Sequence, residues 1–154
     1  MITEICEHLH NFFDTRDGCF IDRNAGTFTI SDEVLSPLPS TLVKGQYLRI
    51  AGSMFNDGVW VLSESEPEEG EEAELYIDGL ADETFTGAVF GLVVPKDFVT
   101  IVAEISAYKT ANPATAYTSE SFGGWSGSRA TGANGLPVSW QGAFASRLNR
   151  WRKL

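Results

Sequence analysis

The sequence predicts an α+β protein in which an antiparallel β-rich module lies between helices. Apolar residues recur three or four apart over residues 2–13 and 95–111, the spacing of amphipathic helices. Residues 24–94 instead hold short apolar runs separated by Gly, Pro, Asn and Asp, which is typical of strands and turns. With 154 residues, 43% hydrophobic and 21% charged, the composition favours one soluble globular domain.

The sequence shows no membrane span and no export signal. The longest apolar run, residues 88–94, is far shorter than the roughly 20 residues that a span needs. The N-terminus lacks the basic-then-apolar layout of a signal peptide. We therefore expect Cys6 and Cys19 to be reduced thiols rather than a disulfide.

The N-terminal element, residues 1–16, is predicted to be a helix over residues 2–13. Asp17-Gly18 supplies the turn that ends it. Its apolar stripe is expected to pack on the protein's own core, and the stripe consists of Ile2, Ile5, Leu9, Phe12 and Phe13.

The β-rich module, residues 24–94, is predicted to contain strands near residues 27–30, 47–51, 59–62, 75–77 and 85–94. Asn56-Asp57-Gly58 tolerates positive φ, so a hairpin is expected between the second and third of these strands.

A strongly acidic segment interrupts the module. Ser63 to Glu74 carries seven glutamates with a proline and a glycine, so we expect a mobile, exposed loop. Clustered carboxylates also suggest Ca²⁺ binding, but no Asp-x-Asp-x-Asp-Gly spacing defines a coordination shell, and a solvated loop is favoured.

Three further elements complete the chain. Pro95 opens a helix at residues 95–111, and Asn112-Pro113 stops it. Residues 112–137 are rich in glycine and are predicted to be an extended arm or loose hairpin. Residues 138–154 form a short C-terminal helix that Ser139 caps, in which Trp140, Phe144 and Leu148 repeat at i+4.

Charge is distributed unevenly along the chain. Residues 1–120 hold all 21 acidic side chains and carry −15, whereas residues 121–154 carry +5 and no acidic side chain. A basic, aromatic tail on an acidic body favours contact with another protein surface and argues against general nucleic-acid binding.

The C-terminal cluster has two main interpretations. Its aromatic residues complete the protein's own core, which is favoured for Phe144 and Leu148, or they dock on an acidic partner. For Trp151 and the four terminal cations we favour an interface, because Trp and Arg are enriched at interface hot spots. Binding of nucleic acid by these cations is a third, weaker interpretation.

No catalytic constellation stands out, so no enzyme, metal or cofactor is predicted. His8 and His10 lie two apart on a helix and point in different directions, which is poor geometry for a shared metal. Neither a Gly-x-Ser-x-Gly elbow nor a phosphate-binding Gly-x-x-x-x-Gly-Lys loop occurs.

The segment Ser119-Glu120-Ser121-Phe122-Gly123-Gly124-Trp125-Ser126, after an amphipathic helix and before a basic C-terminal helix, resembles a known pattern. It is similar to the Ser-Glu-Ser-φ-Gly-x-Tyr-Ser signature of head–tail connector (adaptor, or head-completion) proteins of tailed bacteriophages. Residues 47–58 and 146–154 also look similar to small proteins of phage structural-gene clusters. The usual family form is mostly helical, so the β-rich module at residues 24–94 departs from it.

The resemblance implies a non-catalytic virion protein at the head–tail interface, assembled in the host cytoplasm. Copies would form a ring, typically dodecameric, that joins the portal to the stopper or tail-completion protein and extends the DNA channel. Residues 119–154 would reach the portal or a neighbouring subunit. The candidate partner-binding residues are Glu120, Phe122, Trp125, Arg129, Trp140, Arg147, Arg150, Trp151, Arg152 and Lys153.

Further hypotheses follow from that implication. An acidic lumen would let packaged DNA pass without specific binding. The free protein would be monomeric, with residues 118–137 disordered until the portal is present. The alternatives left open are a tail-completion or tail-terminator ring, a non-ring β adaptor that binds protein near Trp60, and, last, an enzyme.

Overall fold

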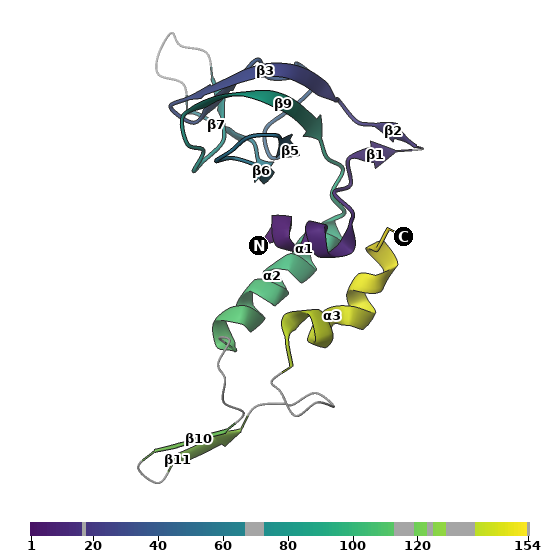
Figure 1. Ribbon diagram of the computed structural model, residues 1–154, viewed down its shortest axis with the longest axis vertical. Helices are drawn as coiled ribbons and strands as arrows, with labels where there is room; N and C mark the ends of the chain where they lie inside the picture. Colours follow the sequence, from purple (N-terminus) through teal and green to yellow (C-terminus); the bar gives the residue numbers. More distant parts are fainter. Residues whose placement is uncertain (17, 67–72, 113–118, 123–124, 129–137, 154) are drawn as a thin grey trace.

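One antiparallel sheet organises the β-rich module. The computed structural model describes residues 1–16, 18–66, 73–112, 119–122, 125–128 and 138–153. Five strands pair in the order β4-β3-β9-β5-β6, and Figure 1 shows the sheet curling over itself with the helices beyond one side. The strands are β3 (Asn24–Ser31), β4 (Val34–Ser36), β5 (Tyr47–Ala51), β6 (Gly58–Val61) and β9 (Glu83–Gly91). The predicted α+β class is therefore confirmed.

Three short hairpins accompany the sheet. β1 (Thr15–Arg16) pairs with β2 (Cys19–Phe20), and β10 (Ser119–Phe122) pairs with β11 (Trp125–Ser128). β7 (Ser63–Glu64) pairs with β8 (Leu75–Tyr76). This last pairing corrects the prediction that residues 63–74 form a loop throughout, because Ser63–Glu64 at its start is a strand. β8 begins directly after the segment, near the strand predicted at residues 75–77, and residues 67–72 lie outside the described residues.

The helices match the prediction in type and order. They are α1 (Ile2–Leu9), α2 (Lys96–Ala111), α3 (Trp140–Leu148) and a final 3-10 turn at Asn149–Trp151. Ser139 caps α3 as expected, since its hydroxyl accepts a hydrogen bond from the backbone N–H of Gly142 at 3.3 Å. Among the residues that the structure describes, none of the helices has the length and apolar character that a membrane span requires.

Helix α1 ends earlier than the predicted residue 13. His10 adopts the left-handed conformation with φ 53°, and the N–H groups of His10 and Asn11 bond to the carbonyls of Glu7 and Cys6. This pair of bonds is the Schellman arrangement, which closes a helix and turns the chain away. Phe12 and Phe13 consequently follow the helix rather than extend its apolar stripe, although both still pack against the core.

The sheet separates two hydrophobic cores. On β5, Leu48 and Ile50 face the core inside the curled sheet, whereas Tyr47 and Ala51 face the helices. Strand β9 alternates in the same way, since Val89 points to the inner core and Phe90 to the helical one. Because side chains alternate in direction with a period of two, β5 and β9 each contribute to both cores.

Close packing in the sheet is most severe at Gly87 on β9. A Cβ there would overlap the carbonyl oxygen of Ala51 on β5. Gly26, its register partner on β3, has open space where a Cβ would lie. Strands β5 and β9 therefore approach closely at a point where only glycine fits.

Candidate binding surfaces

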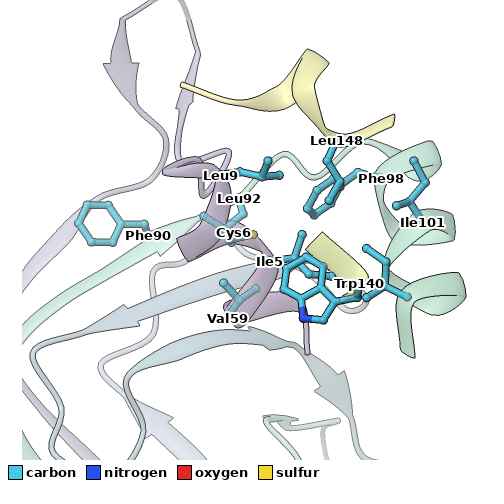
Figure 2. Packing of buried hydrophobic residues seen from close by; sticks show 11 residues of the cluster. Ile5, Cys6, Leu9, Val59, Phe90, Leu92, Phe98, Ile101, Trp140 and Leu148 are labelled. Carbon is cyan, nitrogen blue, oxygen red and sulfur yellow. The ribbon is translucent and has the colours of Figure 1, made fainter. Parts of the chain in front are cut away.

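The apolar residues of the C-terminal helix complete the protein's own core. Trp140 and Leu148 are 6% and 1% exposed, and Phe144 and Trp151 pack against the same cluster. Figure 2 shows Leu148 directed at Leu9 of α1 and Phe98 of α2. The preference for a core role of Phe144 and Leu148 is confirmed. Trp140, a candidate partner residue, has its side chain in this interior.

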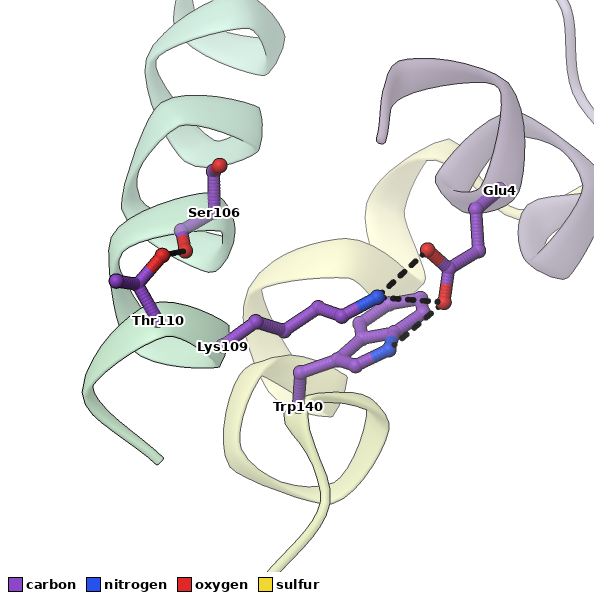
Figure 3. A network of polar contacts seen from close by, with 5 residues as sticks. All are labelled: Glu4, Ser106, Lys109, Thr110 and Trp140. Atoms are coloured by element: carbon purple, nitrogen blue, oxygen red, sulfur yellow. Dashed lines mark hydrogen bonds and ion pairs between the residues drawn. The ribbon is translucent and has the colours of Figure 1, made fainter. Parts of the chain in front are cut away.

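A polar contact fixes the start of α3 (Figure 3). Lys109 of α2 donates to Glu4 of α1 at 2.9 Å, and the indole N–H of Trp140 donates to the same carboxylate at 3.2 Å. The hydrogen bond from Lys109, with help from Trp140, lowers the pKa of Glu4. One carboxylate thus ties together all three helices.

Two candidate partner residues on the outer side of the C-terminal segment pair with α2. Arg147 forms a bidentate ion pair with Glu104, and this hydrogen bonding lowers the pKa of Glu104. Arg150 pairs with Asp97 and lies 3.8 Å from the ring centre of Trp151. Both arginines line an open groove of about 330 Å³ between α2 and α3. Their side chains keep about half of their surface exposed, 46% and 56%.

The last two described cations contact α1 and the segment that follows it. Lys153 lies 3.7 Å from Asp14, which also faces Arg49, and Arg152 lies 3.1 Å from the His8 ring. In the sequence, Arg152 and Lys153 are part of one basic cluster at the C-terminus. In the structure, each lies beside a polar side chain of the N-terminal region.

Backbone contacts reinforce this attachment. The Asn11 side-chain amide donates to the carbonyl of Trp151 at 2.7 Å, and the N–H of Lys153 donates to the carbonyl of Leu9 at 3.1 Å. Asn11 is only 9% exposed, so loss of this bond would leave a buried amide unsatisfied. The end of the described chain is therefore held to α1 and to Asn11 by hydrogen bonds as well as by charge.

The connector-like signature folds as a hairpin. Glu120 and Phe122 lie on β10, opposite Gly127 and Trp125 on β11. Figure 1 shows this hairpin at the end of the molecule away from the sheet. In the part of the chain that the structure describes, no third strand pairs with it. Arg129 lies outside the described residues, and so does most of the predicted arm around the hairpin.

The loop between β5 and β6, residues 52–57, which we call the tip loop, lies where the sequence predicted a hairpin turn, but Met54 and Phe55 were not among the candidate binding residues. Its Met54 and Phe55 side chains are 82% and 65% exposed, the highest values among the exposed large hydrophobic residues that the structure describes. The sequence signal for this surface was an apolar pair, Met54-Phe55, beside a predicted hairpin turn. A pair buried in the core has the same composition, so only the solvent exposure seen in the structure separates the two cases.

The carboxylate of Glu83, at the start of β9, holds the tip loop. It accepts hydrogen bonds from the hydroxyl of Ser53, from the N–H of Met54 at 2.8 Å and from the Asn56 side chain at 3.1 Å. These bonds, with that from Ser53 the strongest, lower the pKa of Glu83. The loop therefore has a fixed shape although its two apolar side chains lie in solvent.

Asn56 anchors the same loop from below. Its side chain is 1% exposed and exchanges two hydrogen bonds with the backbone of Ala81, at 2.9 and 2.8 Å. Its own carbonyl accepts a bond from the indole N–H of Trp60 at 2.8 Å. Trp60 thus supports the loop, and its indole N–H is already engaged within the chain.

An apolar groove opens beside the other end of β5. It has a volume of about 620 Å³ and lies between the segment before β5 and the segment joining β9 to α2. Val43 and Val93 are 61% and 45% exposed in it. We call this site the valine groove, and its principal lining residues are Val43, Val93, Val94, Val99, Lys44 and Lys96.

In the described residues, neither histidine belongs to a group of side chains that could hold a metal ion. His8 packs edge-on against Trp140 with ring centres 5.2 Å apart, and His10 is exposed at the helix end. Within the described ranges, no three His, Cys, Asp or Glu side chains are grouped so as to hold a metal ion. Cys6 is buried and Cys19 exposed, and both are free thiols.

Comparison of the chain with protein-family models, with curated proteins and with solved structures gave no match.

Proposed function

We propose that this chain is a structural subunit of the head–tail junction of a tailed bacteriophage. A ring of copies, dodecameric in the usual arrangement, joins the portal to the stopper or tail and extends the DNA channel. The chain acts by binding proteins rather than by catalysis.

The observation that carries the proposal is the separate hairpin formed by residues 119–122 and 125–128. A two-stranded hairpin alone is marginally stable in water, so such an element gains most from docking on a further surface. Among the described residues no further strand pairs with its outer edges, and such edges suit addition to a strand of another protein. The same residues carry the resemblance to the connector signature.

The charge distribution supports the same function. Residues 1–120 carry −15, so a ring that turns their surface to its channel repels the phosphates of passing DNA. The arginines beside α2 remain half-exposed even though each has a carboxylate partner. An acidic portal surface can therefore approach them without first uncovering them.

Binding to the portal tests the proposal directly. The full chain is mixed with the portal protein from the same genome, and the assembly is examined by native mass spectrometry and electron microscopy. We expect a ring of copies on the portal. Hexameric rings formed without the portal would instead indicate a tail-terminator protein, and absence of any complex would contradict the proposal.

A pair of hairpin variants locates the contact. Phe122→Ala with Trp125→Ala removes both aromatic residues of the closing pair and is expected to abolish portal binding. Ser121→Ala with Ser126→Ala changes the neighbouring cross-strand pair and serves as the matched control, which should still bind. Equal binding by both variants would show that the hairpin is not the docking element.

A further inference from the structure

The tip loop has the properties of a preformed docking element. Met54 and Phe55 are exposed, but the backbone beneath them is held by the Glu83 carboxylate and the buried Asn56 amide. A loop already fixed in shape loses little conformational entropy on binding. Methionine and phenylalanine also give large, adaptable apolar contact areas.

The valine groove has the complementary properties. It is apolar and open, and its volume of about 620 Å³ lies in the range of sites that accept whole ligands, so two side chains fit. The charged residues that line it are Lys44 and Lys96, and no acidic residue is among the described residues lining it. Lys44 also contacts Glu64 at 3.4 Å, outside the groove lining.

Charge at the two sites is opposite in sign. Asp57 lies in the tip loop and Asp82 directly precedes Glu83, and both aspartates are exposed. The tip loop is therefore apolar with acidic neighbours, whereas the valine groove is apolar and bordered by two lysines. Complementarity of this kind orients two surfaces and discourages other pairings, such as tip against tip.

The two sites lie at opposite ends of the same strands. β5 begins with Tyr47, which lines the groove, and ends at Ala51, directly before the tip loop. β9 runs the opposite way, from Glu83 under the tip loop to Gly91, directly before the groove residue Leu92. At about 3.3 Å per residue the length of β5 alone separates them by roughly 15 Å. A chain therefore cannot fill its own groove with its own tip.

We infer that copies of this chain associate head to tail, with the tip loop of one copy seated in the valine groove of the next. Two different surfaces make such a contact heterologous, and a heterologous contact repeats into a ring or a filament. The inference rests on the proposed function in one respect: we take the repeated contact to close into a ring rather than extend into a filament. The contact is small, so it is weak in dilute solution, and a portal that gathers the copies strengthens it through their raised local concentration.

Two half-blocked variants test the contact in solution. Met54→Ser with Phe55→Ser removes the tip, and Val43→Glu with Val93→Glu places carboxylates in the groove. All four positions are exposed, so both variants should keep the wild-type melting temperature. Each variant alone is expected to be monomeric at millimolar concentration, whereas a mixture of the two should form a dimer and nothing larger.

Chemical-shift mapping identifies the surfaces involved. Isotope-labelled tip variant titrated with unlabelled groove variant should show shifts at residues 43–47 and 92–99. With the labels exchanged, the shifts should move to residues 52–57. A chain carrying all four substitutions is the control and should cause none, and Phe20→Ser, at an exposed apolar position elsewhere, should leave wild-type association unchanged.

The outcomes separate this inference from the proposed function. No shifts in the mixture at millimolar concentration, or wild-type association that survives in either variant alone, would overturn the head-to-tail contact even if the protein binds the portal. Shifts at both sites without any portal binding would support the contact and contradict the phage function instead.

Discussion

Truncation of Leu148 decides whether the C-terminal helix belongs to this protein's interior. The side chain is 1% exposed and lies among residues of α1 and α2. Leu→Ala at such a site removes buried methyl groups and leaves a cavity, which typically costs 2–5 kcal/mol of unfolding free energy. We expect a loss of about 3 kcal/mol for Leu148→Ala. A helix that only docks on a partner would lose no more than about 0.5 kcal/mol, as at ordinary surface positions.

Urea denaturation followed by tryptophan fluorescence measures this loss, because Trp140 lies in α3 and Trp151 in the 3-10 turn that follows it. In a chain of 154 residues, a loss of about 3 kcal/mol should lower the melting temperature by about 6–12 °C. Ser146→Ala, at an exposed position of the same helix, is the matched control and should change little. A free energy of unfolding for Leu148→Ala within about 0.5 kcal/mol of wild type would refute the core assignment.

Three further predictions concern single side chains. Asn56→Ala should cost about 2–4 kcal/mol because it removes several hydrogen bonds from a site that is 1% exposed, and hydrogen exchange in the tip loop should accelerate accordingly. Glu83, whose pKa is lowered chiefly by the Ser53 hydroxyl, should stabilise the fold above its ordinary pKa of 4.5. That contribution should disappear as the pH falls through the lower folded pKa, so Glu83→Gln should flatten the acid limb of stability against pH, and an unchanged limb would contradict the hydrogen-bond network. Burial raises the pKa of Cys6 to about 12, so a thiol reagent should modify only the exposed Cys19 until the protein is denatured; rapid modification of both thiols in the native protein would show that the helical core opens readily.

Local periodicity was sufficient for most of the elements. Strand β5 occupies the predicted residues 47–51, and α2 begins and ends within one residue of its predicted limits. Both segments have a complete apolar pattern and end at residues that interrupt helices or strands, so the local sequence is enough to predict their type and limits. The cap at Ser139 belongs to the same class of local signal.

Long-range contacts explain what the sequence could not predict. The side-chain amide of Asn11, directly after the residue that caps α1, bonds to the carbonyl of Trp151, a partner 140 positions away. Likewise Arg147 and Arg150 form a basic cluster in the sequence, but their carboxylate partners come from α2. The spacing of residues along the sequence does not predict these contacts between distant segments.

The candidate surfaces show the same limit. Met54 and Phe55 have the composition of core residues, and their exposure follows from the way that Glu83, nearly thirty residues later, holds the loop. A loose hairpin was one of the two forms predicted for residues 112–137, the other being an extended arm, whereas the separation of β10 and β11 from the sheet is a property of the whole fold. Whether it binds a portal stays a prediction.

The tight spacing of two central strands also has a consequence for how freely this chain can vary. In a saturation library, every replacement at Gly87 should be selected against, because any β-carbon forces β5 and β9 apart. Alanine at Gly26, its neighbour across the ladder, should survive. The two glycines, although they face each other on paired strands, thus differ in their tolerance of substitution, and sequence variation is expected at Gly26 but not at Gly87.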